Sequence, residues 1–249
     1  MSNHAQYVIH KKLIRKLRHS VPFSARKALY KIRCFFEYYY YIMVKRRTFT
    51  FQGKTYEYLY HKYTRTWQNE RAIEIPIVYE ILKKSKAKNI LEVGNVLSHY
   101  FPVDYDIVDK YEYAEGVINQ DIVDFHPPKK YDLIISISTI EHVGWNEKPD
   151  YKIQHTPMKI YKAIENMKGL LAPKGKMVIT VPLGYNSELD ELISNETIQF
   201  TRRLFMKRVS KDNKWIEADY KDVKGAKYGS PLHAANALLV GIIDKTDNN

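Results

Sequence analysis

Short apolar runs, separated by polar turns and helical patterns, dominate the chain from residue 89 onward. They lie at residues 90–93, 105–108, 133–137, 176–181 and 236–245. Unbroken runs of this length are typical of strands that are buried on both faces of a parallel sheet. The pattern therefore predicts an α/β fold. In such folds ligands bind beyond the carboxyl ends of the strands, so the residues after each run are candidates for chemistry.

A helical pattern precedes the first of these strands. Residues 55–89 predict one or two helices with Glu70, Arg71 and Glu74 on their polar side. Pro76 is expected to kink or restart the helix, because proline has no N–H to donate and its ring clashes with the preceding turn. This segment should pack on the sheet edge or cover the ligand crevice.

The composition is that of a globular protein, with 45% hydrophobic residues among 249. A single cysteine, Cys34, excludes an internal disulfide framework and a multi-cysteine zinc site. A reducing compartment is the simpler assumption, so we expect a cytoplasmic protein.

The net charge of +12 belongs almost wholly to the N-terminal fifth. The first 50 residues carry twelve Lys and Arg and one acid, Glu37, whereas the remainder is nearly neutral. We therefore divide the chain into a basic, aromatic helical arm at residues 1–47 and a main domain at residues 48–249. The charge distribution predicts that the arm meets an anionic surface.

The arm has apolar residues at helical spacing between its Lys and Arg residues, and Pro22 is expected to split it. Its apolar and aromatic segment 34–44 is too short for the ~20 residues that span a bilayer. Basic and aromatic residues side by side are typical of a helix in a membrane interface, here the inner face of the membrane. Two other interpretations stay open, a helical cap packed on the main domain and a nucleic-acid contact.

Residues 89–182 resemble the successive motifs of class I S-adenosylmethionine-dependent methyltransferases, and in particular the methyltransferase-11-like branch that acts on small molecules and glycans. The motifs are NILEVGNVLSHY, IVD, NQDIVDF, YDLIISISTIEHV and LLAPKGKMVITVP. The resemblance implies a Rossmann-like, mostly parallel sheet of seven strands in the order 3-2-1-4-5-7-6, with helices on both faces. It also implies S-adenosyl-L-methionine as the cofactor.

Further implications concern individual residues. Glu92 matches the acid that begins the family's glycine-rich loop, although Val96 and Ser98 stand where its second and third glycines would be. Asp109 matches the acid that accepts the ribose hydroxyls, and Asp121 matches the acid at the adenine. The cofactor residues implied in this way are Glu92, Gly94, Asn95, Asp109, Asp121, Ile122, Ser136 and Ser138.

Catalytic groups are expected after the fourth strand. His142 is the candidate general base, because its pKa lies near neutrality, and Glu141 is its candidate partner. The Glu–His pair also resembles a metal-binding motif of ubiquinone-pathway O-methyltransferases. Ser138 replaces the first acid of that motif, so we expect no required metal. Candidate substrate contacts are Trp145, Tyr185 and Asn186.

The acceptor is expected to be a hydroxyl or carboxylate. Residues 136–139 read Ser-Ile-Ser-Thr and lack the motif of base-modifying amino-methyltransferases, and the nearly neutral main domain argues against a nucleic-acid channel. With the basic arm, this favours O-methylation of a saccharide or a lipid-linked polysaccharide precursor at a membrane surface. The alternatives are an RNA-directed methyltransferase and a non-catalytic scaffold that has lost cofactor binding.

Overall fold

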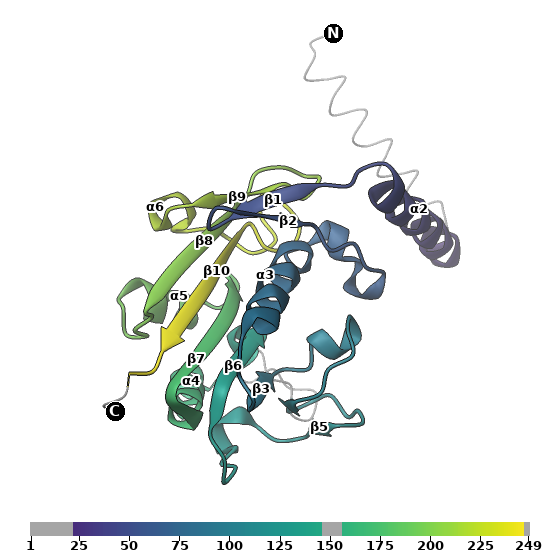
Figure 1. Ribbon diagram of the computed structural model, residues 1–249. Coiled ribbons are helices and arrows are strands. Elements are labelled where there is room, and N and C mark those ends of the chain that lie inside the picture. Colours follow the sequence, from purple (N-terminus) through teal and green to yellow (C-terminus); the bar gives the residue numbers. More distant parts are fainter. Residues whose placement is uncertain (1–21, 146–155, 247–249) are drawn as a thin grey trace. The chain divides into compact units, whose positions relative to one another are not determined.

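The computed structural model describes residues 22–145 and 156–246. The chain divides into two compact units, Met1–Lys45 and Arg46–Asn249, close to the boundary expected from the sequence (Figure 1). The described part of the first unit is the helix α2 (Phe23–Met43), which Pro22 precedes. Helical structure in this part of the arm is therefore confirmed, and the apolar residues expected to be helical before Pro22 lie outside the described residues.

The second unit is built on one mostly parallel sheet. Its strands are β3 (Ile90–Val93), β4 (Asp106–Val108), β5 (Val117–Ile118), β6 (Tyr131–Ile137), β7 (Leu171–Pro182), β8 (Arg202–Arg208), β9 (Trp215–Ala218) and β10 (Ala237–Asp244). They lie in the order β5-β4-β3-β6-β7-β10-β8-β9, and β10 runs antiparallel to both of its neighbours. The expected fold class is confirmed. Without β9, which adds an edge strand, this order corresponds to 3-2-1-4-5-7-6.

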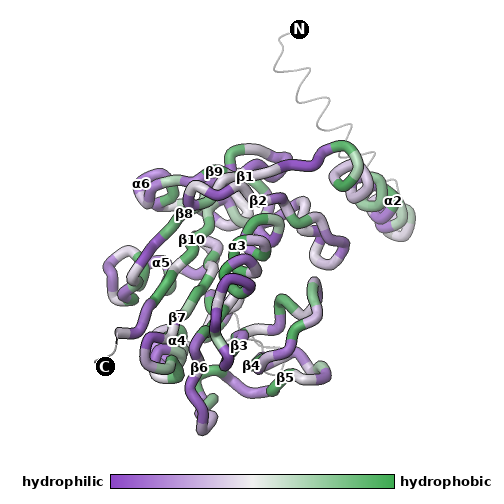
Figure 2. The backbone as a smooth tube through the Cα atoms, in the orientation of Figure 1, coloured by the Kyte–Doolittle hydropathy of each residue, from purple (hydrophilic) through white to green (hydrophobic). Residues whose placement is uncertain are grey.

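Helices cover both faces of this sheet. The remaining elements are a hairpin of β1 (Thr48–Phe51) and β2 (Lys54–Glu57), η1 (Tyr63–Gln68), α3 (Arg71–Lys84), η2 (Leu97–His99), η3 (Ile122–Asp124), η4 (Ile140–His142), α4 (Lys159–Leu170), α5 (Ser187–Ser194) and α6 (Tyr220–Val223). One apolar core joins α3 and the hairpin to the sheet, and the other joins α4 and α5 to it. Figure 2 shows the resulting apolar colouring of the central strands.

Strand β6 illustrates why the central strands show no polar alternation. Leu133 and Ile135 belong to the core under α3, whereas Ile134 belongs to the core under α4. All three side chains are almost completely buried. Because successive side chains point to opposite faces, a strand covered on both faces needs an apolar residue at every position.

The connection between β3 and β4 contains only the short 3-10 helix η2. Aromatic side chains pack beside it. The rings of Tyr79 and Phe101 stack with centroids 3.9 Å apart, and those of Tyr63 and His99 stack at 4.1 Å. These aromatic pairs bury apolar area close to a connection that is too short to form a crossover helix.

Two expectations about α3 are wrong. Glu70, Arg71 and Glu74 do not form a solvated face: Glu70 and Glu74 are buried, and only 18% of the Arg71 side chain is exposed. The helix also runs through Pro76 without a break. The carbonyl of Ala72, which the missing N–H of Pro76 leaves without its helical donor, instead accepts a hydrogen bond from the N–H of Leu59 at 2.9 Å.

We expect Ile135→Ala to lower the free energy of unfolding by about 2 to 5 kcal/mol, because it leaves a cavity in the centre of the sheet. Urea denaturation measures this loss. Ile216→Ala on β9 is the matched control, because Ile216 is 44% exposed and its truncation should change stability by no more than about 0.5 kcal/mol. Equal losses in the two variants would contradict the assignment of β6 to the core.

Candidate functional site

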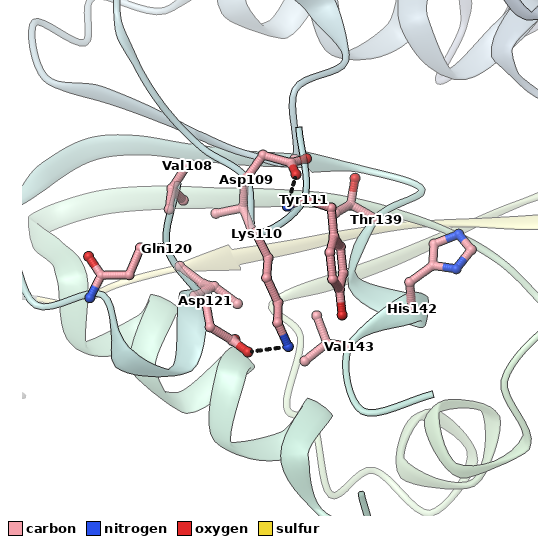
Figure 3. Close-up of a pocket in the computed structure, with 12 residues that line it drawn as sticks. Val108, Asp109, Lys110, Tyr111, Gln120, Asp121, Thr139, His142 and Val143 are labelled. Carbon is pink, nitrogen blue, oxygen red and sulfur yellow. Dashed lines mark hydrogen bonds and ion pairs between the residues drawn. The ribbon is translucent and has the colours of Figure 1, made fainter. Parts of the chain in front are cut away.

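A pocket with about 440 Å³ of empty space opens at the carboxyl ends of β3, β4 and β6 (Figure 3). Its lining residues are Val93, Gly94, Val108, Asp109, Lys110, Tyr111, Gln120, Asp121, Ile122, Thr139, His142 and Val143. Figure 3 shows Gln120 at one end and His142 at the other. The pocket therefore lies at the edge of the sheet where parallel α/β folds bind their ligands.

Gly94 lets the loop after β3 approach the loop after β6. Its φ is +87°, a conformation that L side chains rarely adopt, and its N–H donates to the carbonyl of Val108 at 2.8 Å. A Cβ atom at this position would lie 2.2 Å from Oγ1 of Thr139. Glycine is therefore required here both for its φ and for the close contact with Thr139.

Glu92, an expected cofactor residue, holds the loop after β3 and is not among the residues that line the pocket. The residue is completely buried, and its Oε1 accepts hydrogen bonds from the N–H groups of Val96 (3.0 Å) and Leu97 (2.8 Å). Its Oε2 accepts a hydrogen bond from the Tyr105 hydroxyl at 3.0 Å. Burial raises the pKa of Glu92. Side chains alternate along β3, so Glu92 points to the face opposite Val93.

Asp109 lines the pocket at the end of β4, and its carboxylate also orders the adjacent loops. Its Oδ1 accepts from the N–H groups of Tyr111 and Glu112, both at 2.8 Å, and its Oδ2 accepts from the N–H of Asn95 at 3.1 Å. An ionised carboxylate has about four acceptor positions, so it can accept a further hydrogen bond from a ligand. Asn95 itself is buried, with its Nδ2 donating to Glu112 at 2.7 Å, and does not line the pocket.

Asp121 lies at the far side of the pocket in contact with two lysines. Its Oδ2 is 2.7 Å from Nζ of Lys159 and 3.0 Å from Nζ of Lys110, and its Oδ1 accepts from the N–H of Val123 at 3.2 Å. Burial raises the pKa of Asp121, but the two lysines outweigh this effect, so the pKa is lowered. The beginning of the following 3-10 helix also fixes Ile122, which lines the pocket as expected.

Sequence reasoning missed both lysines. Lys110 directly follows Asp109, so its place at the strand end was an available signal. Lys159 is the first residue of α4 and is distant in sequence from Asp121, so only the tertiary fold brings the two together.

Ser136 and Ser138 do not line the pocket, although both were expected to contact the cofactor. The Ser136 hydroxyl donates to the carbonyl of Val93 at 3.0 Å inside the sheet. The Ser138 hydroxyl donates to Oε2 of Glu74 at 2.7 Å. The residue that lines the pocket at this place is Thr139, which the sequence analysis did not select.

His142 lines the pocket and about half of its side chain is exposed. Burial of the imidazole and the positive charge of Arg71 lower its pKa, so the ring is neutral near pH 7. Glu141 lies underneath, 2% exposed, with its Oε1 at 3.8 Å from Nε2 of His142. Among the residues that the structure describes, none is a hydrogen-bond partner of the Glu141 Oε2 atom, and burial raises the pKa of this carboxyl well above its usual value.

A buried ion pair supports this end of β6. Nη1 of Arg71 donates to the carbonyl of Ile137 at 2.8 Å and lies 3.2 Å from Oε1 of Glu74. The Thr180 hydroxyl of β7 donates to Oε2 of Glu74 at 2.8 Å. The α3 side chains that were expected on a polar surface therefore hold the strand ends beneath the pocket.

The three expected substrate contacts have different surroundings. Tyr185 packs edge to face on the ring of His142, with centroids 4.7 Å apart. Asn186 is buried: its Oδ1 accepts from two N–H groups at the start of α5, and its Nδ2 donates to the carbonyl of Glu141 at 2.8 Å. Trp145 does not line the pocket. Tyr185 thus contacts a residue of the pocket through its side chain.

Comparisons with known proteins give likenesses of fold. No family model matches the chain, and no curated protein matches it. Among solved structures, the N-methyltransferase NodS from Bradyrhizobium japonicum WM9 in complex with S-adenosyl-L-homocysteine is 15% identical, with a TM-score of 0.46 over 71% of this chain and 87% of that chain. A 1,6-didemethyltoxoflavin-N1-methyltransferase from Burkholderia thailandensis is 16% identical, with a TM-score of 0.45 over 76% and 84%. The resemblance to the methyltransferase-11-like branch stays a prediction.

We expect Gly94→Ala to lower the free energy of unfolding by about 1 to 3 kcal/mol, because the new methyl group collides with Thr139. Thermal denaturation with a known enthalpy gives this value. Gly116→Ala is the control for backbone strain, since Gly116 has a φ of +77° and nothing within 4 Å of the added carbon. Its cost should be about 1 kcal/mol.

The collision itself is tested by combining Gly94→Ala with Thr139→Ala. Removing Oγ1 and Cγ2 should recover part of the lost stability, because these are the two nearest atoms to the added carbon. Strictly additive effects of the two substitutions would show that the contact with Thr139 does not require glycine.

Proposed function

We propose that the protein is an S-adenosylmethionine-dependent methyltransferase. The observation that carries this proposal is the convergence of Asp109, Gly94 and His142 on one pocket at the carboxyl ends of β3, β4 and β6. Each belongs to a different strand end, and the three have the chemistry that this cofactor requires. When bound, the cofactor supplies an electrophilic methyl group on a sulfonium.

The pocket residues fit the nucleoside part of such a cofactor. Asp109 retains acceptor capacity for vicinal hydroxyls after its three backbone hydrogen bonds. Asp121 is kept ionised by Lys110 and Lys159, so it presents a fixed acceptor for an exocyclic amine. Val93 and Ile122 supply apolar walls for a base. The close approach at Gly94 leaves the backbone bare toward the cavity.

His142 is placed to accept the acceptor's proton. Its ring is neutral near pH 7 and borders the pocket, and a group with these properties accelerates proton transfer by about 10²- to 10⁴-fold. Glu141 lies 3.8 Å from Nε2, so protonation of the imidazole favours the ionised form of this buried carboxyl. Most of the remaining rate comes from alignment of the acceptor with the methyl group.

The acceptor is a hydroxyl of a saccharide or of a lipid-linked polysaccharide precursor at a membrane surface. The Ser-Ile-Ser-Thr turn supports a hydroxyl acceptor, since it offers no motif for an exocyclic amine, and the nearly neutral second unit disfavours RNA. The membrane part of the proposal depends on the first unit, whose surface is considered below.

Cofactor binding is tested by titration calorimetry with S-adenosylhomocysteine. Asp109→Ala should weaken binding by about 2 to 4 kcal/mol, because two charge-assisted hydrogen bonds are lost. Asp124→Ala is the control, since Asp124 is an exposed acid that does not line the pocket. A chain that binds no S-adenosylhomocysteine would instead favour a non-catalytic scaffold, and an Asp109→Ala variant of normal affinity would overturn the assignment of Asp109 to the ribose.

The role of His142 predicts a pH dependence. The base must be neutral, so kcat/KM should fall as the pH drops through the lowered pKa of His142, below its ordinary value of 6.5. His142→Ala should lose this dependence and about 10²- to 10⁴-fold in rate, with S-adenosylhomocysteine affinity retained. The measurement follows labelled methyl transfer to a lipid-linked saccharide fraction. His126→Ala, an exposed histidine, should behave like the wild type, and a normal rate in His142→Ala would refute the assignment.

A further inference from the structure

The helix α2 presents an apolar face to solvent from Leu29 to Met43. The side chains recur every three or four residues, so they share one face of the helix. All are exposed, from 39% for Tyr39 to 76% for Met43, and the others are Leu29, Ile32, Phe35 and Phe36. None of the α2 side chains that the structure describes is buried. An apolar stripe of this length on a soluble surface marks a docking site.

Basic residues flank this stripe on both sides. Arg26 and Arg33 are seven residues apart and lie along one side, and Lys27 and Lys31 are four apart and lie along the other. Glu37 is the one acid of α2 in the sequence, and it pairs with Arg33 at 2.7 Å. The positive charges in the first turns oppose the helix dipole, which costs stability unless an anion lies nearby.

Aromatic residues cluster in the C-terminal half of the helix. The sequence CFFEYYYYIM contains six Phe and Tyr residues, and the rings of Phe35 and Tyr39 lie 4.7 Å apart on the apolar face. Tyrosine is enriched at the boundary between the hydrocarbon core and the head groups of a membrane, because its ring is apolar and its hydroxyl can form hydrogen bonds with water. In the part of the chain that the structure describes, no helix has the length and hydropathy needed to cross a bilayer.

We propose that α2 binds the surface of an anionic lipid membrane, lying parallel to it with the face of Leu29, Ile32, Phe36 and Met43 among the acyl chains. The flanking Lys and Arg side chains then reach the head groups. A second copy of the helix would cover the apolar face but bring like charges together. Nucleic acid would satisfy the charges but leave the apolar face in water.

The test is co-sedimentation of the full-length chain with vesicles of phosphatidylcholine and phosphatidylglycerol in equal parts, and with phosphatidylcholine alone. Ile32→Gln/Phe36→Gln should weaken binding to the mixed vesicles at least about tenfold, because two apolar side chains no longer enter the membrane. Tyr30→Gln/Tyr41→Gln is the matched control, since both tyrosines lie on the opposite face, and it should bind nearly as the wild type does. Lys27→Gln/Lys31→Gln should lose preference for the anionic vesicles, and salt should weaken the wild type.

The proposal is overturned if the wild-type chain does not bind the mixed vesicles at low salt, or if Ile32→Gln/Phe36→Gln and Tyr30→Gln/Tyr41→Gln bind equally. It is also overturned if Ile32→Gln/Phe36→Gln dissociates an oligomer in light scattering while vesicle binding is unchanged, which would identify a second copy as the occupant. This inference does not rest on the proposed reaction. S-adenosylhomocysteine binding, measured on the same preparations, reports on the second unit alone and should be equal in all variants.

Discussion

The candidate site depends on the hydrogen bonds and the ion pair that the guanidinium of Arg71 makes. The guanidinium is held under the end of β6, where it donates to the carbonyls of Ile137 and Ser138. A buried cation is costly without an ionic partner, and Glu74 supplies one at 3.2 Å. Glu74 in turn accepts from Ser138 and Thr180, so a single helix residue pair fixes the ends of two neighbouring strands.

The same pair shapes the electrostatics above it. Burial of the imidazole, together with the charge of Arg71, lowers the pKa of His142, so the ring stays neutral near pH 7 and able to accept a proton. At the ends of β3 and β4, two further acids hold loops. Glu92 accepts hydrogen bonds from backbone N–H groups of the loop after β3, and Asp109 accepts them from the loop after β4. Hydrogen bonds from backbone N–H groups to these carboxylates thus fix the conformations of both loops.

The strands were predictable because both faces of the sheet are covered. Continuous apolar runs leave little ambiguity, and β3, β6 and β10 lie within two residues of the expected ranges. The acids at strand ends were also found, because topology places them there. The prediction that the charged side chains of α3 are solvated was wrong. Glu70, Arg71 and Glu74 do follow helical spacing. Such spacing shows which residues share a face of the helix, but it does not show that this polar face lies against the end of a strand. For the same reason Lys159 escaped detection.

The protonation states of Glu141 and His142 depend on each other. Oε2 of Glu141 has no partner among the described residues, and an ionised carboxylate in that position would be strongly destabilising. Burial raises the pKa of this carboxyl well above its usual value and so favours its neutral form. When His142 takes up a proton, the positive charge arises 3.8 Å from Oε1 and favours the ionised form of Glu141. The two groups are therefore coupled: a proton on His142 makes the proton of Glu141 easier to release, and an ionised Glu141 makes His142 easier to protonate.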